Sequence, residues 1–370
     1  MGRIRVLIVD DAVVVRRLLD QAISSDPALE VAGTAPSGRI ALEKISRLNP
    51  DLVVLDIEMP EMDGLQTLAA IRRARPELPV IMFSNLTRRG AEATMDALFL
   101  GASDYVSKPA TAGGPAAALQ RVREELLPRI RSLGARSADA APLPAARRGP
   151  SAKVTPSMRR VDIVAIGVST GGPNALATIF SRLPAAFPVP VLVVQHMPPV
   201  FTTMLAERLA SRSAISVSEG AHGEVLRARH AWIAPGDVHM SVERCGGENR
   251  ILLAQGPPEN SCRPAVDVLL RSVADVYGDG ALTIVLTGMG QDGFRGCEAV
   301  HEAGGQILVQ DEETSIVWGM PGFVARSGLA DMVLPLDRIT GEIIRRVEVG
   351  RPAGAGTRAP ALREAAEMPG

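Results

Sequence analysis

The sequence predicts an α/β protein with two doubly wound parallel-sheet domains, one after the other. Short apolar runs rich in Val, Ile and Leu recur along the chain, as expected for strands buried on both faces of a parallel sheet. Helical patterns separate these runs, which is the order of elements in doubly wound folds. The 370 residues are also long for one hydrophobic core, so two domains and a linker are expected.

Composition sets the expected domain boundaries. Two segments are rich in Ala, Pro, Gly and Arg and show no apolar periodicity, so neither can bury enough surface to fold alone. We therefore expect a first domain at 1–130, a linker at 131–159, a second domain at 160–348 and a disordered tail at 349–370.

The first domain should contain five strands that alternate with helices. The strands are expected at residues 4–9, near 31, at 52–55, at 80–83 and at 104–106. Polar side chains follow four of them, and the carboxyl edge of a parallel sheet is where ligands bind. These side chains are Asp10, Asp11, Asp56, Ser84 and Lys108.

The three carboxylates at this edge would repel one another unless a divalent cation lay among them. Mg²⁺ prefers such oxygen ligands and keeps positions open for phosphate oxygens. Asp56 can then attack a phosphoryl donor while Lys108 balances charge on the transferred group. Ser84 can hydrogen-bond the attached phosphoryl group. Each acid alone fits a solvated loop, but their joint position favours a phosphoryl-acceptor site.

The second domain is organised around an apolar strand at 163–168 that ends at Ser169. Gly171 and Gly172 permit a tight turn, and Pro173 suits the first turn of the helix that follows. A hydroxyl in this position either caps the helix or serves as a nucleophile, and this segment alone leaves both interpretations open.

Two further strands favour the nucleophile. The run at 189–194 leads to His196, and the run at 282–287 leads to Asp292. A serine hydroxyl is a weak nucleophile until an imidazole takes its proton, and a carboxylate must orient that imidazole. We therefore expect Ser169, His196 and Asp292 to meet at one sheet edge as a catalytic triad. The rest of the domain is expected to hold helices near 174–183, 199–209, 263–273 and 293–303, short strands between 217 and 241, and a late strand at 306–309.

Composition excludes several classes of function. The formal net charge is −1 and the basic residues are not gathered on one helix, so no nucleic-acid partner is expected. Cys245, Cys262 and Cys297 have unrelated spacings, which argues against a disulfide framework and a zinc site. No apolar run reaches the roughly 18–20 residues that span a bilayer, and no signal peptide is evident. We expect a cytoplasmic monomer without membrane insertion.

The first domain resembles the receiver domain of two-component response regulators over about residues 3–128. The motifs that carry the resemblance are Val9-Asp-Asp11, Leu55-Asp-Ile-Glu-Met-Pro-Glu-Met-Asp-Gly64, Ser84 and Lys108-Pro109. The resemblance implies that Asp56 accepts phosphate from a histidine kinase and that Asp10, Asp11, Asp56 and the backbone carbonyl of Glu58 hold Mg²⁺. It also implies that Ser84 and Tyr105 form the switch pair, and that the bond before Pro109 is cis.

The second domain closely resembles the catalytic domain of the chemotaxis protein-glutamate methylesterase family over about residues 160–348. The main motifs are Gly167-Val-Ser-Thr-Gly-Gly-Pro173, Gln195-His-Met-Pro-Pro199, Ala234-Pro-Gly-Asp-Val-His-Met240 and Leu286-Thr-Gly-Met-Gly-Gln-Asp-Gly293. The resemblance implies that Ser169 is the nucleophile, His196 the general base and then acid, and Asp292 the orienting carboxylate. Thr170 lies beside the nucleophile, and Met289 lies in a loop that contributes a backbone amide to the oxyanion hole.

The two resemblances together imply a phosphorylation-activated enzyme of chemotaxis adaptation. It would demethylate glutamate γ-methyl esters on methyl-accepting chemoreceptors and deamidate selected glutamines there, with a chemotaxis-type histidine kinase as phosphodonor. Hydrolysis itself would need no cofactor. Two alternatives remain at this point: a degenerate second domain that only binds receptor or kinase, and a general peptidase or esterase.

Overall fold

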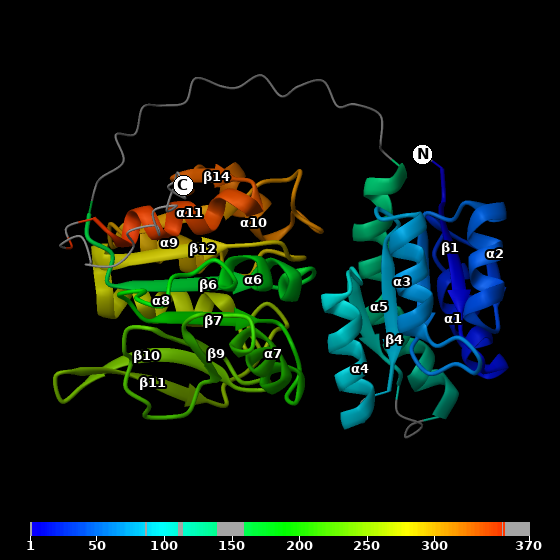
Figure 1. Cartoon of the computed structure of the whole chain (residues 1–370), viewed down its shortest axis with the longest axis horizontal. Coiled ribbons are helices and arrows are strands. Elements are labelled where there is room, and N and C mark those ends of the chain that lie inside the picture. Colours follow the sequence, from blue (N-terminus) through cyan, green and yellow to red (C-terminus); the bar gives the residue numbers. More distant parts are fainter. Residues whose placement is uncertain (1, 86, 110–113, 139–158, 350, 352–370) are drawn as a thin grey trace, which may run out of the picture.

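The computed structural model describes residues 2–85, 87–109, 114–138, 159–349 and 351, and it divides into the two halves seen in Figure 1. Most of the expected linker and tail, at 139–158 and 352–370, lies outside the described residues. Helix α5 continues to Ala138, so ordered structure extends beyond residue 131, where the linker was expected to begin.

The first half is a five-stranded, all-parallel sheet in the order β2-β1-β3-β4-β5. Helices α1 and α5 contact each other on one face, and α2, α3 and α4 contact one another in sequence on the opposite face. The elements are β1 (Ile4–Val9), α1 (Val13–Ser24), β2 (Leu29–Ala35), α2 (Gly38–Leu48), β3 (Leu52–Asp56), α3 (Gly64–Ala74), β4 (Val80–Ser84), α4 (Arg88–Phe99), β5 (Asp104–Ser107) and α5 (Gly114–Ala138).

The second half is a seven-stranded, all-parallel sheet in the order β14-β13-β12-β6-β7-β9-β8. Helices α6, α7 and α11 cover one face, and α8, α9 and α10 cover the other. The elements are β6 (Ile163–Val168), α6 (Gly172–Phe180), β7 (Val191–Gln195), α7 (Phe201–Ala210), β8 (Ser216–Glu219), β9 (His230–Ile233), β10 (His239–Cys245), β11 (Glu248–Ala254), α8 (Val266–Tyr277), the 3₁₀ helix η1 (Gly278–Gly280), β12 (Ala281–Val285), α9 (Phe294–Glu302), β13 (Gln306–Gln310), α10 (Met320–Ser327), β14 (Met332–Leu334) and α11 (Leu336–Val347).

The predicted fold class is confirmed, with one addition to the second half. Strands β10 and β11 form a separate antiparallel hairpin that packs on α8. Gly246 and Gly247 form its two-residue turn, and both have positive φ, of 61° and 85°. This is the backbone geometry that favours glycine in tight hairpins. The cis proline bond among the described residues joins Arg263 to Pro264, so the expected cis bond before Pro109 is wrong.

The start of α3 shows how local sequence builds the edge of the first sheet. The side chain of Asp63 accepts a hydrogen bond from the Gln66 amide at 2.8 Å, and the Gln66 side chain accepts one from the Asp63 amide at 3.2 Å. This capping box satisfies two helix-end amides. A Cβ on Gly64 would lie 2.2 Å from the carbonyl oxygen of Asp56. Glycine at this position therefore lets α3 begin directly beside the predicted phosphoryl acceptor.

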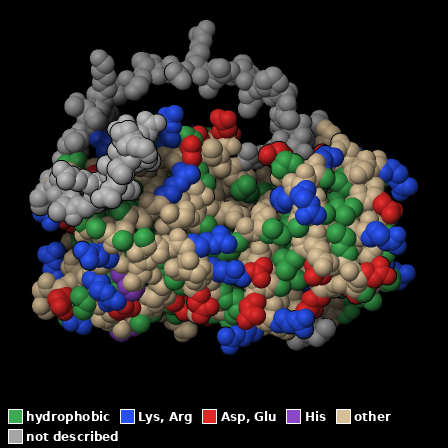
Figure 2. Space-filling model, in the orientation of Figure 1, with side chains coloured by type: hydrophobic (Ala, Val, Ile, Leu, Met, Phe, Trp, Pro, Cys, Tyr) green, Lys and Arg blue, Asp and Glu red, His purple; other side chains and the backbone are tan. Residues whose placement is uncertain are grey.

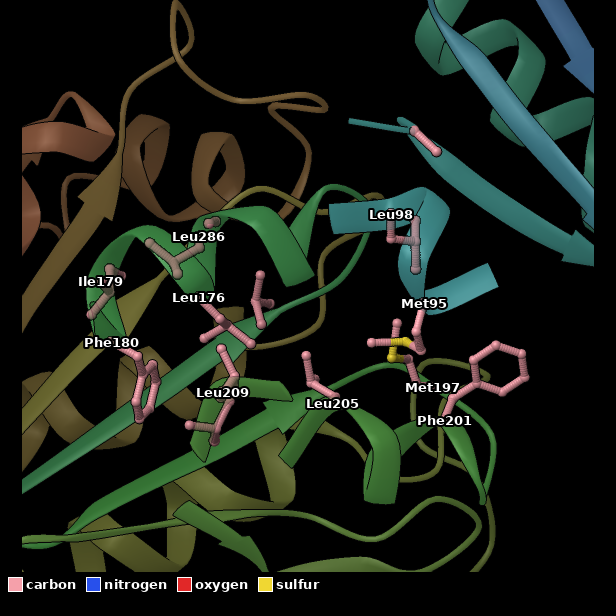
Figure 3. Packing of buried hydrophobic residues seen from close by; sticks show 14 of the residues in the cluster. Met95, Leu98, Leu176, Ile179, Phe180, Met197, Phe201, Leu205, Leu209 and Leu286 are labelled. Carbon is pink, nitrogen blue, oxygen red and sulfur yellow. The ribbon is translucent and has the colours of Figure 1, made fainter. Parts of the chain in front are cut away.

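The two halves share apolar packing. One buried cluster contains Met95 and Leu98 of α4 together with residues of α6 and α7 in the second half. Figure 3 shows these side chains beside Met197 and Phe201. On the other face, Val317 of the second half belongs to the cluster that packs β1, α1 and α5 of the first half. The first half therefore rests its α4 and α5 side on the second half (Figure 1).

Acidic and basic side chains are mixed over both halves on the face shown in Figure 2. A single-sign stripe of charge is not visible there. This mixture agrees with the near-zero formal net charge of −1.

Candidate active site and phosphoryl-acceptor site

The parallel register brings two residues of the predicted triad to neighbouring strand ends. Val168 of β6 pairs with Gln195 of β7, so Ser169 and His196 both follow directly after paired residues. The amide of His196 donates a hydrogen bond to the carbonyl of Val168 at 3.2 Å. Asp292 lies in the loop between β12, the other neighbour of β6, and α9. All three side chains therefore reach the same carboxyl edge.

His196 and Asp292 are in direct contact. Imidazole Nε2 lies 2.7 Å from Asp292 Oδ2. The same carboxylate accepts hydrogen bonds from the backbone amides of Val266, at 2.7 Å, and Asp267, at 3.0 Å, where α8 begins. Unpaired amides at a helix start favour an anion. Burial alone raises the pKa of Asp292, but His196 and these amides outweigh it, so the pKa lies below its usual value.

A second layer of side chains holds this carboxylate. Asn260 Nδ2 donates to Asp292 Oδ1 at 3.0 Å and to Asp267 Oδ2 at 2.8 Å. The other oxygen of Asp267 accepts from the Gly296 amide at 2.7 Å. Burial raises the pKa of Asp267. These residues fix the position of Asp292, and they were not among the predicted site residues.

The remaining nitrogen of the imidazole faces a cysteine. Sγ of Cys262 lies 3.5 Å from His196 Nδ1. Burial by itself lowers the pKa of His196. Hydrogen bonds and charge interactions with Asp292 and Cys262 raise it by a larger amount, so the pKa is about 9. Because Nε2 is bonded to Asp292, Nδ1 is the nitrogen that can accept a proton from a nucleophile. Cys262 was noted in the sequence only as an unpaired thiol.

The hydroxyl of Ser169 makes no hydrogen bond within the described part of the chain, so the imidazole contact expected for a nucleophile is not formed here. Its backbone is fixed more tightly. The carbonyl of Ser169 accepts from Gln195 Nε2 at 2.9 Å, and the amide donates to the carbonyl of Thr287 at 3.0 Å. A Cβ on Gly288 would lie 2.8 Å from Ser169 Cβ. The turn that carries Ser169 is therefore packed closely against the end of β12.

The two expected oxyanion or pocket residues both touch the first half. Thr170 Oγ1 donates to Asp104 Oδ2 at 2.7 Å, and both side chains are buried. Met289 Sδ accepts from Ser132 Oγ of α5 at 3.2 Å. The backbone amide of Met289 has no hydrogen-bond partner among residues that the structure describes, which leaves it available as a donor. The side chain of Thr170 is directed away from any such role.

The first half carries its own polar site. Lys108 Nζ lies 2.9 Å from Asp10 Oδ2 and 2.8 Å from Asp56 Oδ2. Burial raises the pKa of Asp56 to about 6, because its effect exceeds the opposing effect of Lys108. Carboxylate oxygens of Asp10, Asp11 and Asp56 lie within 4.8 Å of one another. Asp11 is exposed and the other two are buried. Three carboxylates arranged in this way are a suitable ligand set for Mg²⁺.

The other predicted residues of this half surround that site. The amide of Glu58 donates to Asp56 Oδ1 at 3.4 Å. Ser84 follows in β4, and its Oγ accepts from Thr94 Oγ1 at 2.8 Å. Tyr105 lies further away and stacks its ring on Phe201 of α7, with 4.7 Å between the centroids. The expected switch residue is thus part of the contact between the halves.

His196, Cys262 and Asp292 also satisfy a distance criterion for metal ligands, within 4.8 Å of one another. The hydrogen bonds argue against that interpretation. Asp292 is bonded to Nε2 and Cys262 faces Nδ1, so the two lie on different nitrogens of the ring. One ion cannot replace both contacts. We interpret the three residues as a hydrogen-bonded chain.

Comparison with known proteins agrees with the division of the chain into two halves. The family described as CheB methylesterase matches residues 164–343, and the response regulator receiver domain matches residues 6–119. The chain is 52% identical to a protein-glutamate methylesterase/protein-glutamine glutaminase of Trichodesmium erythraeum over 94% of this chain and 100% of the relative. It is 50% identical to a protein of the same name from Nocardioides sp. over 95% and 98%, respectively.

A solved structure supports the architecture of the second half. The CheB methylesterase catalytic domain of Thermotoga maritima is 42% identical and has a TM-score of 0.50, covering 50% of this chain and 99% of that domain. None of the helices in the described residues is long and apolar enough to cross a membrane.

Proposed function

The chain belongs to the CheB methylesterase family, and from this premise we propose that it is a phosphorylation-activated hydrolase of chemoreceptors. Its substrates are glutamate γ-methyl esters and selected glutamine side chains on methyl-accepting chemoreceptors. Its role is adaptation in chemotaxis. The observation that carries the proposal is the 2.7 Å bond between His196 Nε2 and Asp292 Oδ2 at the strand end beside Ser169.

In the first step Ser169 Oγ attacks the γ-carbonyl carbon of the substrate. His196 Nδ1 takes the hydroxyl proton, while Asp292 holds Nε2 and balances the imidazolium charge. The Met289 amide is placed to stabilise negative charge that develops on the carbonyl oxygen. His196 then gives its proton to the leaving group, which departs as methanol from an ester or ammonia from an amide. This step leaves an acyl enzyme on Ser169.

In the second step water replaces the leaving group. His196 Nδ1 takes a proton from water as its oxygen attacks the acyl carbon, and then returns that proton to Ser169 Oγ. The product is a free glutamate in both cases. An ester and a primary amide can therefore share one route, which agrees with the double activity in the names of the relatives.

The first half would receive the regulatory phosphoryl group. Asp56 is the acceptor, because it is the carboxylate that ends β3 and contacts Lys108 at 2.8 Å. Lys108 balances charge on the transferred group, and Ser84 is near enough along β4 to hydrogen-bond it. Asp10, Asp11, Asp56 and the backbone carbonyl of Glu58 would hold Mg²⁺. When bound, Mg²⁺ supplies positive charge beside the phosphate oxygens.

Contact between the halves supports control of the second site by the first. The residue next to the nucleophile, Thr170, is bonded to Asp104, and the expected switch residue Tyr105 is stacked on Phe201. This arrangement restricts access of a large receptor helix to Ser169. Phosphorylation of Asp56 would favour a conformation in which this contact is lost. The phosphodonor is a histidine kinase of the chemotaxis type. The proposed enzyme acts in the cytoplasm, on the cytoplasmic part of the receptor, and as a monomer.

The test is release of methanol from the methylated cytoplasmic part of a chemoreceptor. Ser169→Ala should lower the rate by roughly 10⁴- to 10⁶-fold, as removal of a serine nucleophile does elsewhere. Ser181→Ala is the matched control, because Ser181 is an exposed serine at the end of α6. Equal rates for wild type and Ser169→Ala would favour a non-catalytic second half. Rapid turnover of small acyl esters, without turnover of receptor, would favour a general esterase.

A further inference from the structure

The catalytic imidazole contacts a thiol as well as a carboxylate. Cys262 lies in the loop before α8 and is half-buried. Its Sγ is 3.5 Å from His196 Nδ1, and His196 Nε2 is 2.7 Å from Asp292 Oδ2. This is a hydrogen-bonded series of a thiol, an imidazole and an orienting carboxylate. Such a series is the arrangement that activates a nucleophilic cysteine.

We propose that Cys262 is a second nucleophile that uses the imidazole of His196, and that its modification by soft electrophiles or peroxides stops hydrolysis. The effect on hydrolysis rests on the proposed function. The reactivity of the thiol does not, because it depends only on the contact between Cys262 and His196.

The chemistry is that of a thiolate–imidazolium pair. The thiol proton moves to His196 Nδ1, and the sulfur then attacks a peroxide oxygen. An S–O bond forms, the O–O bond breaks, and the proton on Nδ1 passes to the departing oxygen. Cys262 is oxidised to a sulfenic acid while hydrogen peroxide is reduced to water. With iodoacetamide an S–C bond replaces the C–I bond, iodide leaves, and the proton passes to solvent.

Modification should stop hydrolysis because of the position of Nδ1. Asp292 occupies Nε2, so Nδ1 is the nitrogen that Ser169 must use. A group attached to Sγ, 3.5 Å from Nδ1, occupies the space through which that proton would move. Even the unmodified thiol competes with the serine for this nitrogen. Cys262 therefore makes His196 Nδ1 less available as the base that the proposed reaction needs.

The two other cysteines provide internal references. Cys245 is exposed at the end of β10, and the structure shows no histidine bonded to it in the described chain. Cys297 lies buried in α9, where burial raises the pKa of its thiol. An ordinary thiol is only a few per cent thiolate at pH 7. A thiol that can pass its proton to an imidazole should therefore react faster than Cys245 or Cys297.

The first measurement is the rate at which iodoacetamide labels each cysteine of the full-length chain at pH 7, followed by mass spectrometry of peptides. His196→Gln should slow labelling of Cys262 at least about tenfold and leave labelling of Cys245 unchanged. Unchanged labelling of Cys262 in this variant would overturn the proposal, provided that Cys297 stays unlabelled and the fold is intact. This readout holds whether or not the chain hydrolyses receptor.

The second measurement needs no histidine variant. Hydrogen peroxide should abolish methanol release by wild type at the rate at which Cys262 is oxidised. The rate of Cys262→Ala after peroxide, divided by the rate of the same variant without peroxide, should stay near one, whereas Cys245→Ala, the matched control, should lose as large a fraction of its rate as wild type. Inactivation of Cys262→Ala at the wild-type rate would refute the proposal. If untreated wild type releases no methanol, the proposed function fails, and the labelling rates still decide the reactivity of Cys262.

Discussion

Removing one buried hydrogen bond between the halves should activate the unphosphorylated enzyme. Asp104→Ala deletes the carboxylate that accepts from Thr170 Oγ1 at 2.7 Å. Both residues are 7% exposed, so the bond is shielded from water. A hydrogen bond to a charged group contributes about 1.5–3 kcal/mol. The bond from Arg129 Nε to Asp104 Oδ2 lies within the first half and does not join the two halves.

The matched control is an exposed pair in the same interface. Asp96 and Arg208 also join the two halves, but their side chains are 43% and 40% exposed. Such pairs contribute about 0.2–1 kcal/mol. Since 1.4 kcal/mol is a tenfold change, Asp104→Ala should raise basal hydrolysis by about 30-fold, and Asp96→Ala by no more than about fivefold. The gain cannot exceed the rate of the phosphorylated enzyme.

The assay compares methanol release with and without a small-molecule phosphodonor, and thermal unfolding verifies that both variants are folded. When both are fully phosphorylated, wild type and Asp104→Ala should hydrolyse receptor at the same rate. In that state neither protein has the contact between its two halves. Equal basal rates for the two variants would show that the bond between Thr170 and Asp104 does not restrain Ser169. A changed rate for phosphorylated Asp104→Ala would also count against this role, since it would indicate damage to the active site.

Three further predictions concern single residues. In the proposed reaction neutral His196 is the base, and its pKa is about 9, so kcat/KM should rise about tenfold per pH unit below pH 9 and level off above it. Cys262→Ala removes one cause of the high pKa and should move the midpoint of this profile to lower pH, whereas an unmoved midpoint would contradict the assignment of the profile to His196. Asp292→Asn should lower kcat by about 10⁴-fold, measured as methanol release from a variant shown to be folded, and a loss under tenfold would argue against the orienting role. Asp56→Asn should abolish stimulation by a phosphodonor and leave basal hydrolysis intact, and a variant that is still stimulated would count against Asp56 as the acceptor.

The strand ends could be predicted because an apolar run followed by a polar residue is a local pattern in the sequence. Four of the five strands in the first half stop at a polar residue, as Asp10 and Asp56 show. The parallel fold then brings separate strand ends to one edge, so a shared edge for His196 and Asp292 was predictable, whereas their 2.7 Å contact was not. The hairpin of β10 and β11 was missed, although Gly246-Gly247 between two alternating runs is a turn signal.

Other features depend on tertiary contacts that leave no local pattern. Cys262 approaches His196 because the preceding loop turns through Asn260 and Ser261, which have positive φ of 51° and 63°. Asn260 is a residue type that tolerates this conformation, but no local pattern shows that the turn brings Cys262 to His196. Docking of Thr170 on Asp104 joins residues 66 positions apart in different domains. Such contacts depend on how the surfaces of two domains fit together. The periodicity of apolar residues in the sequence does not encode that fit.

The apolar cluster that bridges the halves has a thermal consequence. Parting them would expose Met95, Leu98 and Phe201 to water. Exposure of apolar surface increases heat capacity, and the hydrophobic contribution to closure weakens on cooling. Restraint of the enzyme by its own receiver should therefore be firmer in warm solution, and chilling should release part of it without any phosphate.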